Sequence, residues 1–539
     1  MKLVSNWPEA KQYTRQQRWR QLQHHQPIDV VVIGGGITGA AIFRELARYG
    51  VKVALFEQGD FASGTSSRSS KLIHGGLRYL GKGQLSLAIQ SIRARQWLKQ
   101  QLPGFVKPLH FMVPHYQGNF PGQHSFDLLI KIYDRLARES HSGSLCTHQV
   151  LARQPLLNWQ GLQGGSIFTD CISDDARLVM RLITEAEADG GIALNYAKVE
   201  AIQQSNRGVT LAVRNQITHQ CTSLAVKTVA NAVGVWINGD DYQQPSLYQI
   251  RPLRGSHLLI PGWRLPMSGA ISFFHPEDRR PIFILPWQGA TVIGTTDVDH
   301  NSPLAADISI TPNEIDYLLA ACNQVLPNLQ LTRDDVQASW SGVRPVLAGK
   351  EKQAPSALSR EHVIWRQGAI VNITGGKLTT FKLIAEQTLA LLKEVISLPT
   401  SLINSQWFRQ INRQPLLPFT QLSFTEQQRL YGTYGAWLSL WRLQNKQSLQ
   451  VFAPSPTLYA ELEWILQQEQ VVHLDDLLLR RTRIGLLCPL GGRQWFSELK
   501  PLCCQWLGWN EVKWQAEADR YLTIWQQAYS LPELLTKAA

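Results

Sequence analysis

Residues 28–57 read IDVVVIGGGITGAAIFRELARYGVKVALFE, and this stretch decides the fold. A β-branched apolar run at 28–33 leads into three glycines, residues 37–49 have apolar residues at helical spacing, and 51–57 form a second apolar run. The pattern predicts a strand, a helix and a second strand, which together make a βαβ unit. The chain is therefore predicted to have an α/β fold built on parallel strands.

The glycines of this unit match GxGxxG at Gly34, Gly36 and Gly39, the fingerprint of a dinucleotide-binding, Rossmann-like fold. The first permits a tight turn, the second lets a pyrophosphate approach the backbone, and the third lets helix and strand pack closely. Glu57 ends the second strand, where a carboxylate can accept hydrogen bonds from ribose hydroxyls. A tight turn without a ligand would explain the glycines alone, but the flanking strands and Glu57 favour the dinucleotide site.

The length and composition predict several folded units. The chain has 539 residues, 44% of them hydrophobic and 17% charged, so it is too long for one core and too apolar for wholesale disorder. Its seven cysteines are an odd number, and no two form a CxxC pair. This spacing argues against a disulfide framework and against a zinc or iron–sulfur site, so no metal is expected.

The first 27 residues and the net charge bear on location and partners. Residues 1–27 hold five basic residues but no apolar core, so neither a signal peptide nor a membrane-spanning helix is predicted there. With 53 basic and 41 acidic residues the chain carries +12, which implies attraction to something anionic. The excess is diffuse and no nucleic-acid-binding motif accompanies it, so a nucleic-acid partner is not expected.

Two interpretations of the N-terminal segment stay open. Its basic and aromatic side chains could form a segment that lies in a membrane interface. The same segment could equally be a frayed arm with ordinary solubilising charge. The residues concerned are Arg15, Arg18 and Arg20 with Trp7, Tyr13 and Trp19.

Residues 59–80, GDFASGTSSRSSKLIHGGLRYL, are rich in glycine and hydroxyl side chains and contain little that could fill a core. Such a loop suits hydrogen bonding to a large heterocycle and a pyrophosphate. Together with the dinucleotide unit, it resembles the FAD-dependent, quinone-linked glycerol-3-phosphate dehydrogenases of respiratory chains. The resemblance continues through SDDARLV (173–179), NAVGVW (231–236), RGSH (254–257), PWQGATVIGTTD (286–297), SGVRP (341–345), GGKLTTFK (375–382) and ELEWILQQEQVVHLDDLLLRRTRIG (461–485).

This resemblance implies an architecture of three parts. We expect an FAD-binding Rossmann-like domain, a mixed α+β substrate or cap domain with an antiparallel sheet, and a C-terminal helical domain. The boundaries expected are 1–27 for a basic extension, 28–395 for the FAD-binding domain interleaved with the cap, about 80–170 and 240–340 for the cap itself, and 396–539 for the helical domain.

The resemblance also implies the reaction, which is oxidation of sn-glycerol 3-phosphate to dihydroxyacetone phosphate. Hydride passes to flavin N5, and electrons continue to membrane quinone. His257 is the candidate base for the C2 hydroxyl, because an imidazole titrates near pH ~6.5, and Arg344 is the candidate for stabilising developing charge. A structural histidine at a strand start is the alternative for His257. The groups expected at the substrate phosphate are Arg78, Tyr79, Lys377 and Thr379.

The same resemblance implies a set of FAD-binding positions. His74 among them is expected to donate a hydrogen bond to the flavin rather than to act as the base. Lys71 could instead only anchor its loop by bonding carbonyl groups, and Gly376 could belong to a plain strand-to-helix turn. The full set is Gly34, Gly36, Thr38, Gly39, Glu57, Thr65, Ser66, Ser67, Ser70, Lys71, His74, Gly75, Gly76, Val199, Ala232, Gly234, Trp236, Gly342, Gly376 and Leu378.

The partners implied are FAD, glycerol 3-phosphate, quinone and a lipid surface on the cytoplasmic face of a membrane, and a homodimer stays open. A glycerol-3-phosphate oxidase that uses oxygen shares the half-reaction and is the nearest alternative. An amine or amino-acid oxidase of the same wider fold is a more distant one. A redox-silent, flavin-containing binding protein is the alternative from outside the enzymes.

Overall fold

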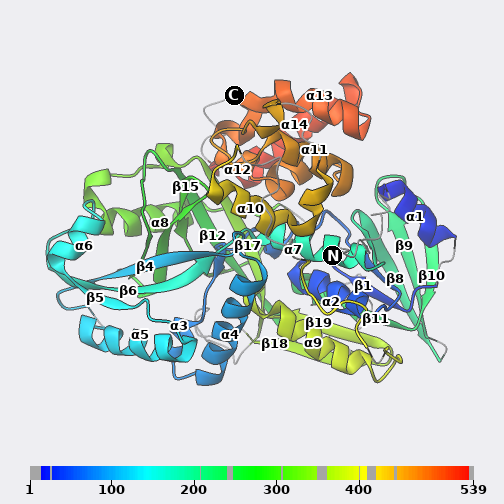
Figure 1. Cartoon of the computed structure of the whole chain (residues 1–539), viewed down its shortest axis with the longest axis horizontal. Helices are drawn as coiled ribbons and strands as arrows, with labels where there is room; N and C mark the ends of the chain where they lie inside the picture. Colours follow the sequence, from blue (N-terminus) through cyan, green and yellow to red (C-terminus); the bar gives the residue numbers. More distant parts are fainter. Residues whose placement is uncertain are drawn as a thin grey trace, which may run out of the picture.

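The computed structural model describes residues 14–24, 27–119, 121–206, 208–238, 247–304, 307–348, 361–399, 401–409, 421–441 and 446–532. Figure 1 shows a large sheet on the left, a second sheet around β1 on the right, and the C-terminal helices, coloured orange to red, above both. This arrangement confirms the predicted α/β fold with a C-terminal helical part.

A six-stranded sheet contains the predicted βαβ unit. Its strands run in the order β18-β19-β11-β1-β2-β7, and all neighbours are parallel except β18 and β19. The predicted strand, helix and strand are therefore confirmed as β1, α2 and β2. The bounds are β1 (Val30–Ile33), α2 (Ile37–Arg48), β2 (Val53–Phe56), β7 (Ile192–Leu194), β11 (Thr228–Asn231), β18 (His362–Gln367) and β19 (Ile370–Gly375).

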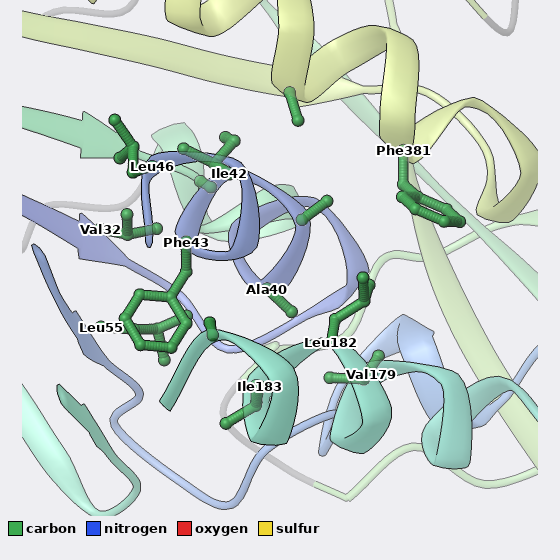
Figure 2. Close-up of a cluster of buried hydrophobic side chains, with 14 of the residues drawn as sticks. Val32, Ala40, Ile42, Phe43, Leu46, Leu55, Val179, Leu182, Ile183 and Phe381 are labelled. Carbon is green, nitrogen blue, oxygen red and sulfur yellow. The ribbon is translucent and has the colours of Figure 1, made fainter. Parts of the chain in front are cut away.

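Helix α2 lies between α7 (Asp175–Ala188) and α9 (Phe381–Leu392), and the three helices share one apolar core with the sheet. Figure 2 shows α2 between the other two helices, with Phe43 beside Leu55 of β2 and above Ile183 of α7. The sequence predicts a helix capped by Asp174-Asp175. The structure confirms it as α7, because the Asp174 carboxylate accepts a hydrogen bond from the Arg177 N–H.

The large sheet is antiparallel apart from the pairing of β13 with β4. β17 pairs with β12, and β5 pairs with β6. In the pairing of β12 with β17, His257 lies directly opposite Trp340. The strands are β3 (Leu72–Ile73), β4 (Lys107–Tyr116), β5 (Gly143–Cys146), β6 (Leu162–Ile172), β12 (Ile250–Pro261), β13 (Ala270–Phe274), β14 (Pro281–Trp287), β15 (Ala290–Gly294), β16 (Val298–Asp299) and β17 (Ala338–Leu347).

Among the described residues, five α-helices accompany this sheet, and α8 has the capping box formed by Thr311 and Glu314. The sequence predicts that helix after Thr311-Pro312, and the structure confirms it. The five are α3 (Leu77–Gly81), α4 (Leu85–Gln101), α5 (Gln123–Ala137), α6 (Thr147–Arg153) and α8 (Pro312–Val325).

A third sheet of three antiparallel strands was only partly predicted. The sequence indicates strands at 197–202 and 226–233, whereas the structure has β8 (Ala197–Ser205), β9 (Gly208–Asn215) and β10 (Cys221–Val226) before β11. The predicted second run therefore joins the end of β10 to β11, across a break at Lys227.

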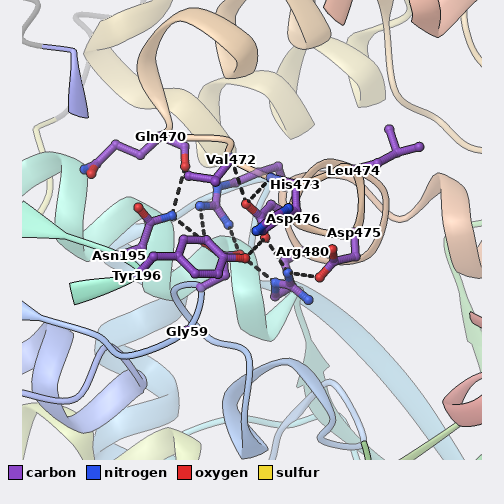
Figure 3. Close-up of polar contacts among 12 residues, drawn as sticks. Gly59, Asn195, Tyr196, Gln470, Val472, His473, Leu474, Asp475, Asp476 and Arg480 are labelled. Atoms are coloured by element: carbon purple, nitrogen blue, oxygen red, sulfur yellow. Dashed lines mark hydrogen bonds and ion pairs between the residues drawn. The ribbon is translucent and has the colours of Figure 1, made fainter. Parts of the chain in front are cut away.

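The C-terminal helices share an apolar core with the large sheet, in which Trp525 and Leu477 cluster with Trp340 and Trp287. Polar contacts also attach these helices to the end of β7 in the six-stranded sheet. The Tyr196 hydroxyl, for example, donates a hydrogen bond to Asp476 at 2.6 Å (Figure 3). The helices are α10 (Phe424–Tyr434), α11 (Tyr459–Gln468), α12 (Ile484–Leu487), α13 (Phe496–Leu507) and α14 (Glu511–Ala528).

The described residues of the N-terminal segment form a helix that packs on the rest of the chain. Helix α1 (Arg15–Gln23) docks on the chain, with Trp19 buried and the Arg15 guanidinium bonded to the Asn195 and Tyr196 carbonyls. Arg18 forms an ion pair with Glu187 at 2.7 Å. Both interpretations made from the sequence are therefore wrong for residues 15, 18 and 19, while Trp7 and Tyr13 lie outside the described residues.

Candidate functional site

The glycine turn has the geometry that its sequence predicts. Gly34 has φ +103°, and a Cβ on Gly39 would lie 1.9 Å from the Gly34 carbonyl oxygen, so β1 and α2 approach more closely than any side chain allows. A Cβ on Gly36 would meet only the Ser66 hydroxyl, at 3.1 Å. No acidic residue occupies the first turn of α2, so its positive end is compatible with a pyrophosphate.

The Glu57 carboxylate fastens this turn to the end of β2. It accepts hydrogen bonds from the N–H groups of Gly35 at 2.7 Å and Gly59 at 2.8 Å. Burial raises the pKa of Glu57, and the two backbone N–H groups oppose that effect. Gly35 is a part of the site that the GxGxxG pattern does not single out.

The loop after β2 crosses strand β17 and meets several predicted positions. The Ser66 hydroxyl accepts from the Ile37 N–H at 2.9 Å, and the Thr65 hydroxyl donates to the Val343 carbonyl. A Cβ on Gly342 would lie 3.0 Å from the Arg68 backbone. The loop and β17, more than 270 residues apart in sequence, therefore form one surface beside the glycine turn.

Other predicted FAD positions also gather around this turn. A Cβ on Gly34 would lie 2.5 Å from the Ala232 carbonyl oxygen, and the ring of Trp236 lies against Gly64. The Thr374 hydroxyl donates to the Gly234 carbonyl at 3.1 Å, which brings β19 to the same place. Because backbone groups of these segments surround the N-terminus of α2, the residues present fit a dinucleotide.

Two predicted positions have other surroundings. Val199 is buried in the apolar core beneath the three-stranded sheet. Gly75 donates its N–H to Asp170 at 2.9 Å, and a Cβ there would lie 1.9 Å from the Tyr133 hydroxyl. These contacts give Val199 and Gly75 packing roles within the chain. The remaining positions are Thr38 on α2, Ser67 in the loop, His74 after β3, Gly76 preceding α3, and Gly376 and Leu378 after β19, and their contacts with FAD stay predictions.

His257 lies within β12 rather than at a strand start, and it is almost fully buried. Its Nε2 is 2.8 Å from the Ser70 hydroxyl, and its ring stacks on Trp340 with centroids 5.2 Å apart. Nδ1 has no hydrogen-bond partner among the residues that the structure describes. Burial first, and then the charges of Lys71 and Arg344, hold the pKa of His257 well below 6.5, so the ring is neutral at pH 7.

Arg344 of β17 lies beside the same region. Its Nη2 donates to the Thr296 carbonyl at 3.4 Å and is 3.5 Å from Asp297. The side chain is 27% exposed, and its charge acts on His257. The structure therefore brings together the two residues that the sequence assigns to the C2 hydroxyl.

The Lys71 ammonium is completely buried, and it is used inside the protein. It donates to the Ser67 carbonyl at 2.5 Å and to both carboxylate oxygens of Asp175 at 2.9 and 3.0 Å. Burial lowers the pKa of Lys71 to about 8. These contacts favour the anchoring alternative for Lys71, and Asp175 is a residue of the site that the sequence analysis missed.

The four residues expected at the phosphate lie on two segments far apart in sequence. Arg78 and Tyr79 belong to α3, whereas Lys377 and Thr379 follow β19. The structure joins the segments, because the Lys377 ammonium lies 3.7 Å from the centroid of the Tyr79 ring. The Thr379 hydroxyl is buried and has no hydrogen-bond partner within the described ranges.

Comparison with known proteins agrees with this geometry. Residues 29–380 match the model of the FAD dependent oxidoreductase family, and residues 376–513 match the C-terminal domain of alpha-glycerophosphate oxidase. An aerobic glycerol-3-phosphate dehydrogenase of Staphylococcus saprophyticus is 35% identical over 68% of this chain and 67% of its own. One from Staphylococcus aureus is 31% identical over 84% of this chain and 86% of its own.

Solved structures give the same assignment. A Bacillus halodurans glycerol-3-phosphate dehydrogenase complexed with FAD superposes with a TM-score of 0.75 at 27% identity, over 95% of this chain and 98% of its own. The L-alpha-glycerophosphate oxidase of Mycoplasma pneumoniae shares the fold, with a TM-score of 0.56 at 19% identity over 72% of this chain and 99% of its own. The chain thus belongs to the FAD-dependent oxidoreductases, in the group that includes the aerobic glycerol-3-phosphate dehydrogenases.

Proposed function

We propose that this protein oxidises sn-glycerol 3-phosphate to dihydroxyacetone phosphate and passes the electrons to membrane quinone. The observation that carries the proposal is His257, a neutral imidazole with an unpartnered nitrogen beside the cationic Arg344. A base and a fixed positive charge are what oxidation of an alcohol needs from the protein. The relatives named for this substrate support the same reading.

In the proposed reaction, the C2 hydroxyl loses its proton and C2 loses a hydride, so the substrate gives up two electrons. FAD, when bound, supplies the hydride acceptor. His257 accepts the hydroxyl proton at its unpartnered nitrogen, while Ser70 and Trp340 hold the ring in place. Arg344 stabilises the negative charge that builds on the substrate oxygen.

Binding of the substrate phosphate falls to the pair of segments that meet at Tyr79 and Lys377. Two cations, Arg78 and Lys377, suit a dianion, and the buried Thr379 hydroxyl has a hydrogen bond to give. For the cofactor, the backbone around Gly36, Ser66 and Ala232 would hold the pyrophosphate and ribose, and the loop through Ser70 would lie against the ring system.

A surface suited to lipid supports quinone as the acceptor. On α5, Leu128 and Ile132 are 61% and 44% exposed and lie one turn apart, and both acidic residues of the helix are buried. Exposed basic side chains flank them at Lys131 and Arg135. An apolar face with a basic border binds anionic lipid surfaces. Over the described part of the chain, no helix is both long and apolar enough to cross a bilayer.

Oxygen is the second candidate acceptor, because the C-terminal part matches the domain named for alpha-glycerophosphate oxidase. Stopped-flow reoxidation of the reduced flavin distinguishes the two. A short-chain quinone should reoxidise it far faster than dissolved oxygen, with no peroxide formed. Stoichiometric peroxide would instead establish an oxidase.

The substrate itself is tested by anaerobic bleaching of the flavin with a panel of compounds. Glycerol 3-phosphate should bleach it, whereas glycine, proline and simple amines should not. Bleaching by an amino acid alone would contradict the proposal, and no bleaching by any of them would point to a redox-silent protein. Attachment to the cytoplasmic face of a membrane, a homodimer and the domain boundaries stay predictions.

A further inference from the structure

A row of buried charges joins the C-terminal helices to the loop that contacts His257. Arg483, which precedes α12, donates to both carboxylate oxygens of Asp174, at 2.9 and 2.7 Å, and to Asp175 Oδ1 at 2.7 Å. Asp175 in turn binds the Lys71 ammonium of the loop. All four side chains are at most 7% exposed.

Asp175 fixes the loop at more than one point. Its Oδ2 accepts from the Ser69 N–H at 2.9 Å and from the Ser69 hydroxyl at 2.7 Å. Lys71 also returns to the Ser67 carbonyl. Ser70 therefore lies between two residues that are both bound to Asp175, and Ser70 is the residue that touches His257 Nε2.

The second support of the imidazole depends on the same loop. The Trp340 indole N–H donates to the Ser69 carbonyl at 3.1 Å, and the Trp340 ring stacks on His257 at an interplanar angle of 15°. The Lys71 ammonium lies 4.9 Å from that ring. The hydrogen bond and the stacked ring that orient His257 therefore both depend on Asp175, which binds Ser69 and Lys71.

Arg483 supplies the positive charge that balances the second of two neighbouring carboxylates. Asp174 and Asp175 are adjacent buried carboxylates with two negative charges, and the Lys71 ammonium by itself would balance only one of them. Although burial opposes it, the Arg483 charge lowers the pKa of Asp174 to about 2 and keeps that carboxylate ionised. Without Arg483, two buried acids would compete for one ammonium, and the loop would lose its fixed geometry.

We propose that Arg483 is a positioning residue, through which the C-terminal helices set the orientation of His257. It acts by holding Asp175, which holds Ser69 and Lys71 and so places Ser70 and Trp340 against the imidazole. The proposal rests on the proposed function only in taking His257 as the base. It gives the C-terminal helices a part in the chemistry, although Arg483 lies 226 residues from His257 in the sequence.

The test compares Arg483→Gln with Arg177→Gln in the FAD-loaded protein. Arg177 is a matched control, because it forms a buried bidentate ion pair with Glu469 between the same helix α7 and the same C-terminal part. Within the described part of the chain, its side chain forms no hydrogen bond or ion pair with residues 64–71. Both variants should lower the thermal midpoint, since each breaks a buried pair.

Hydrogen exchange of the loop amides is the first readout and needs no substrate. The Ser69 N–H donates to Asp175, and the Lys71 N–H donates to the Ser69 hydroxyl. Both amides therefore report directly on the attachment of the loop to Asp175. Exchange of a peptide that spans 65–73 should become roughly tenfold faster or more in Arg483→Gln and stay unchanged in Arg177→Gln. Equal behaviour of this peptide in the two variants would overturn the proposal.

Flavin reduction by glycerol 3-phosphate is the second readout. The limiting rate should fall about ten- to a hundredfold in Arg483→Gln, because a small displacement of the base has that effect, while substrate affinity stays within about twofold. Arg177→Gln should reduce flavin normally. A loss confined to affinity, or shared by both variants, would contradict positioning of His257.

Ser69→Ala covers the case in which Arg483→Gln does not fold. It deletes the hydrogen bond from the Ser69 hydroxyl to Asp175 and the one that this hydroxyl accepts from the Lys71 N–H, and it leaves all four buried charges in place. Because the Lys71 amide loses its acceptor directly, the readout is exchange at the amide of residue 69, which is bonded to Asp175. This amide should exchange faster, and an unchanged rate would again overturn the proposal. If glycerol 3-phosphate does not bleach even the unmodified protein while the exchange result holds, the proposed function is wrong. The attachment of the loop to Arg483 through Asp175 is then still supported.

Discussion

His257 and Ser70 meet where the large sheet touches the loop of the dinucleotide fold, with Nε2 2.8 Å from the serine hydroxyl. In the tautomer that donates from Nε2 to Ser70, the lone pair is on Nδ1, the nitrogen with no partner among the described residues. A neutral ring held this way can accept one proton at a defined atom. The residues that support it therefore decide the chemistry as much as the histidine does.

Replacing His257 with Asn should lower the rate of flavin reduction by ~10²–10⁴-fold and leave FAD bound, because the proton acceptor is lost while some hydrogen bonding is kept. Anaerobic stopped-flow absorbance measures the rate, and the flavin-to-protein ratio provides the control. Ser70→Ala should give a smaller loss, since it removes orientation alone. A near-normal rate in His257→Asn would assign the base elsewhere, and His74 is the next residue to change.

The pH dependence of the protein should reflect the buried imidazole. An ordinary histidine would put the acid limb of the rate near pH 6.5, but burial, Lys71 and Arg344 hold the pKa of His257 well below that value, so the limb should lie lower. Below pH 6.5 the unfolded chain takes up a proton that the folded chain does not. The free energy of unfolding should therefore fall by up to ~1.4 kcal/mol per pH unit from this group as the pH drops through 6.5.

Denaturant unfolding at pH 7.5, 6.5 and 5.5 checks this linkage, with His257→Asn as the comparison. The variant should lose less stability than the unmodified protein over that interval. Identical pH profiles would mean that the imidazole is protonated in the folded state as readily as in the unfolded one.

Local signals in the sequence predicted a large part of the fold. The glycine turn and the caps at Asp174 and Thr311 depend on residues within a few positions of each other, and the structure confirms each of these elements. The docking of α1 could not be predicted, because its partners Asn195 and Gln220 lie 180 residues or more away. Its mixed composition of Arg, Gln and Trp indicates an exposed segment when seen alone.

The same contrast between local signals and contacts of distant residues applies to the candidate site. Gly34, Gly36 and Gly39 have fixed spacing, so their roles follow from the sequence. The contacts of His257 with Trp340 and of Lys71 with Asp175 follow from strand pairing and helix placement over about 80 to 100 residues, and no periodicity encodes them. Arg483 stands in the sequence only within the stretch 461–485 that carries the resemblance, and the sequence alone does not identify its partners.

The glycine turn offers a test that separates cofactor binding from folding. Gly36→Val should give folded protein without FAD, because its Cβ meets only the Ser66 hydroxyl while the side chain fills the phosphate approach. Gly39→Ala should instead destabilise the fold, since its Cβ would lie 1.9 Å from the Gly34 oxygen. Flavin absorbance and circular dichroism measure the two effects. Full flavin content in Gly36→Val would remove the pyrophosphate assignment.

Lys377 and Arg78 should recognise the phosphate group specifically. Each alanine variant should weaken glycerol 3-phosphate about ten- to a hundredfold, the usual effect of losing a charge-assisted partner worth ~1.5–3 kcal/mol. Unphosphorylated glycerol should be oxidised as poorly by the variants as by the unmodified protein. Tyr79→Phe keeps the ring beneath the Lys377 ammonium and should cost less affinity. Equal losses for both substrates would make these cations structural.

Thr379 provides the sharpest test of the phosphate site, because its buried hydroxyl has no partner in the described structure. Thr379→Val removes that hydroxyl at nearly constant volume, so the ligand-free protein should be as stable as before or slightly more stable. Affinity for glycerol 3-phosphate should nevertheless fall roughly tenfold, since the hydrogen bond to the substrate is lost. The thermal midpoint without substrate and a titration of flavin bleaching measure the two quantities. A variant that is less stable yet binds substrate normally would show that Thr379 serves the fold, and the phosphate would then have to be placed elsewhere.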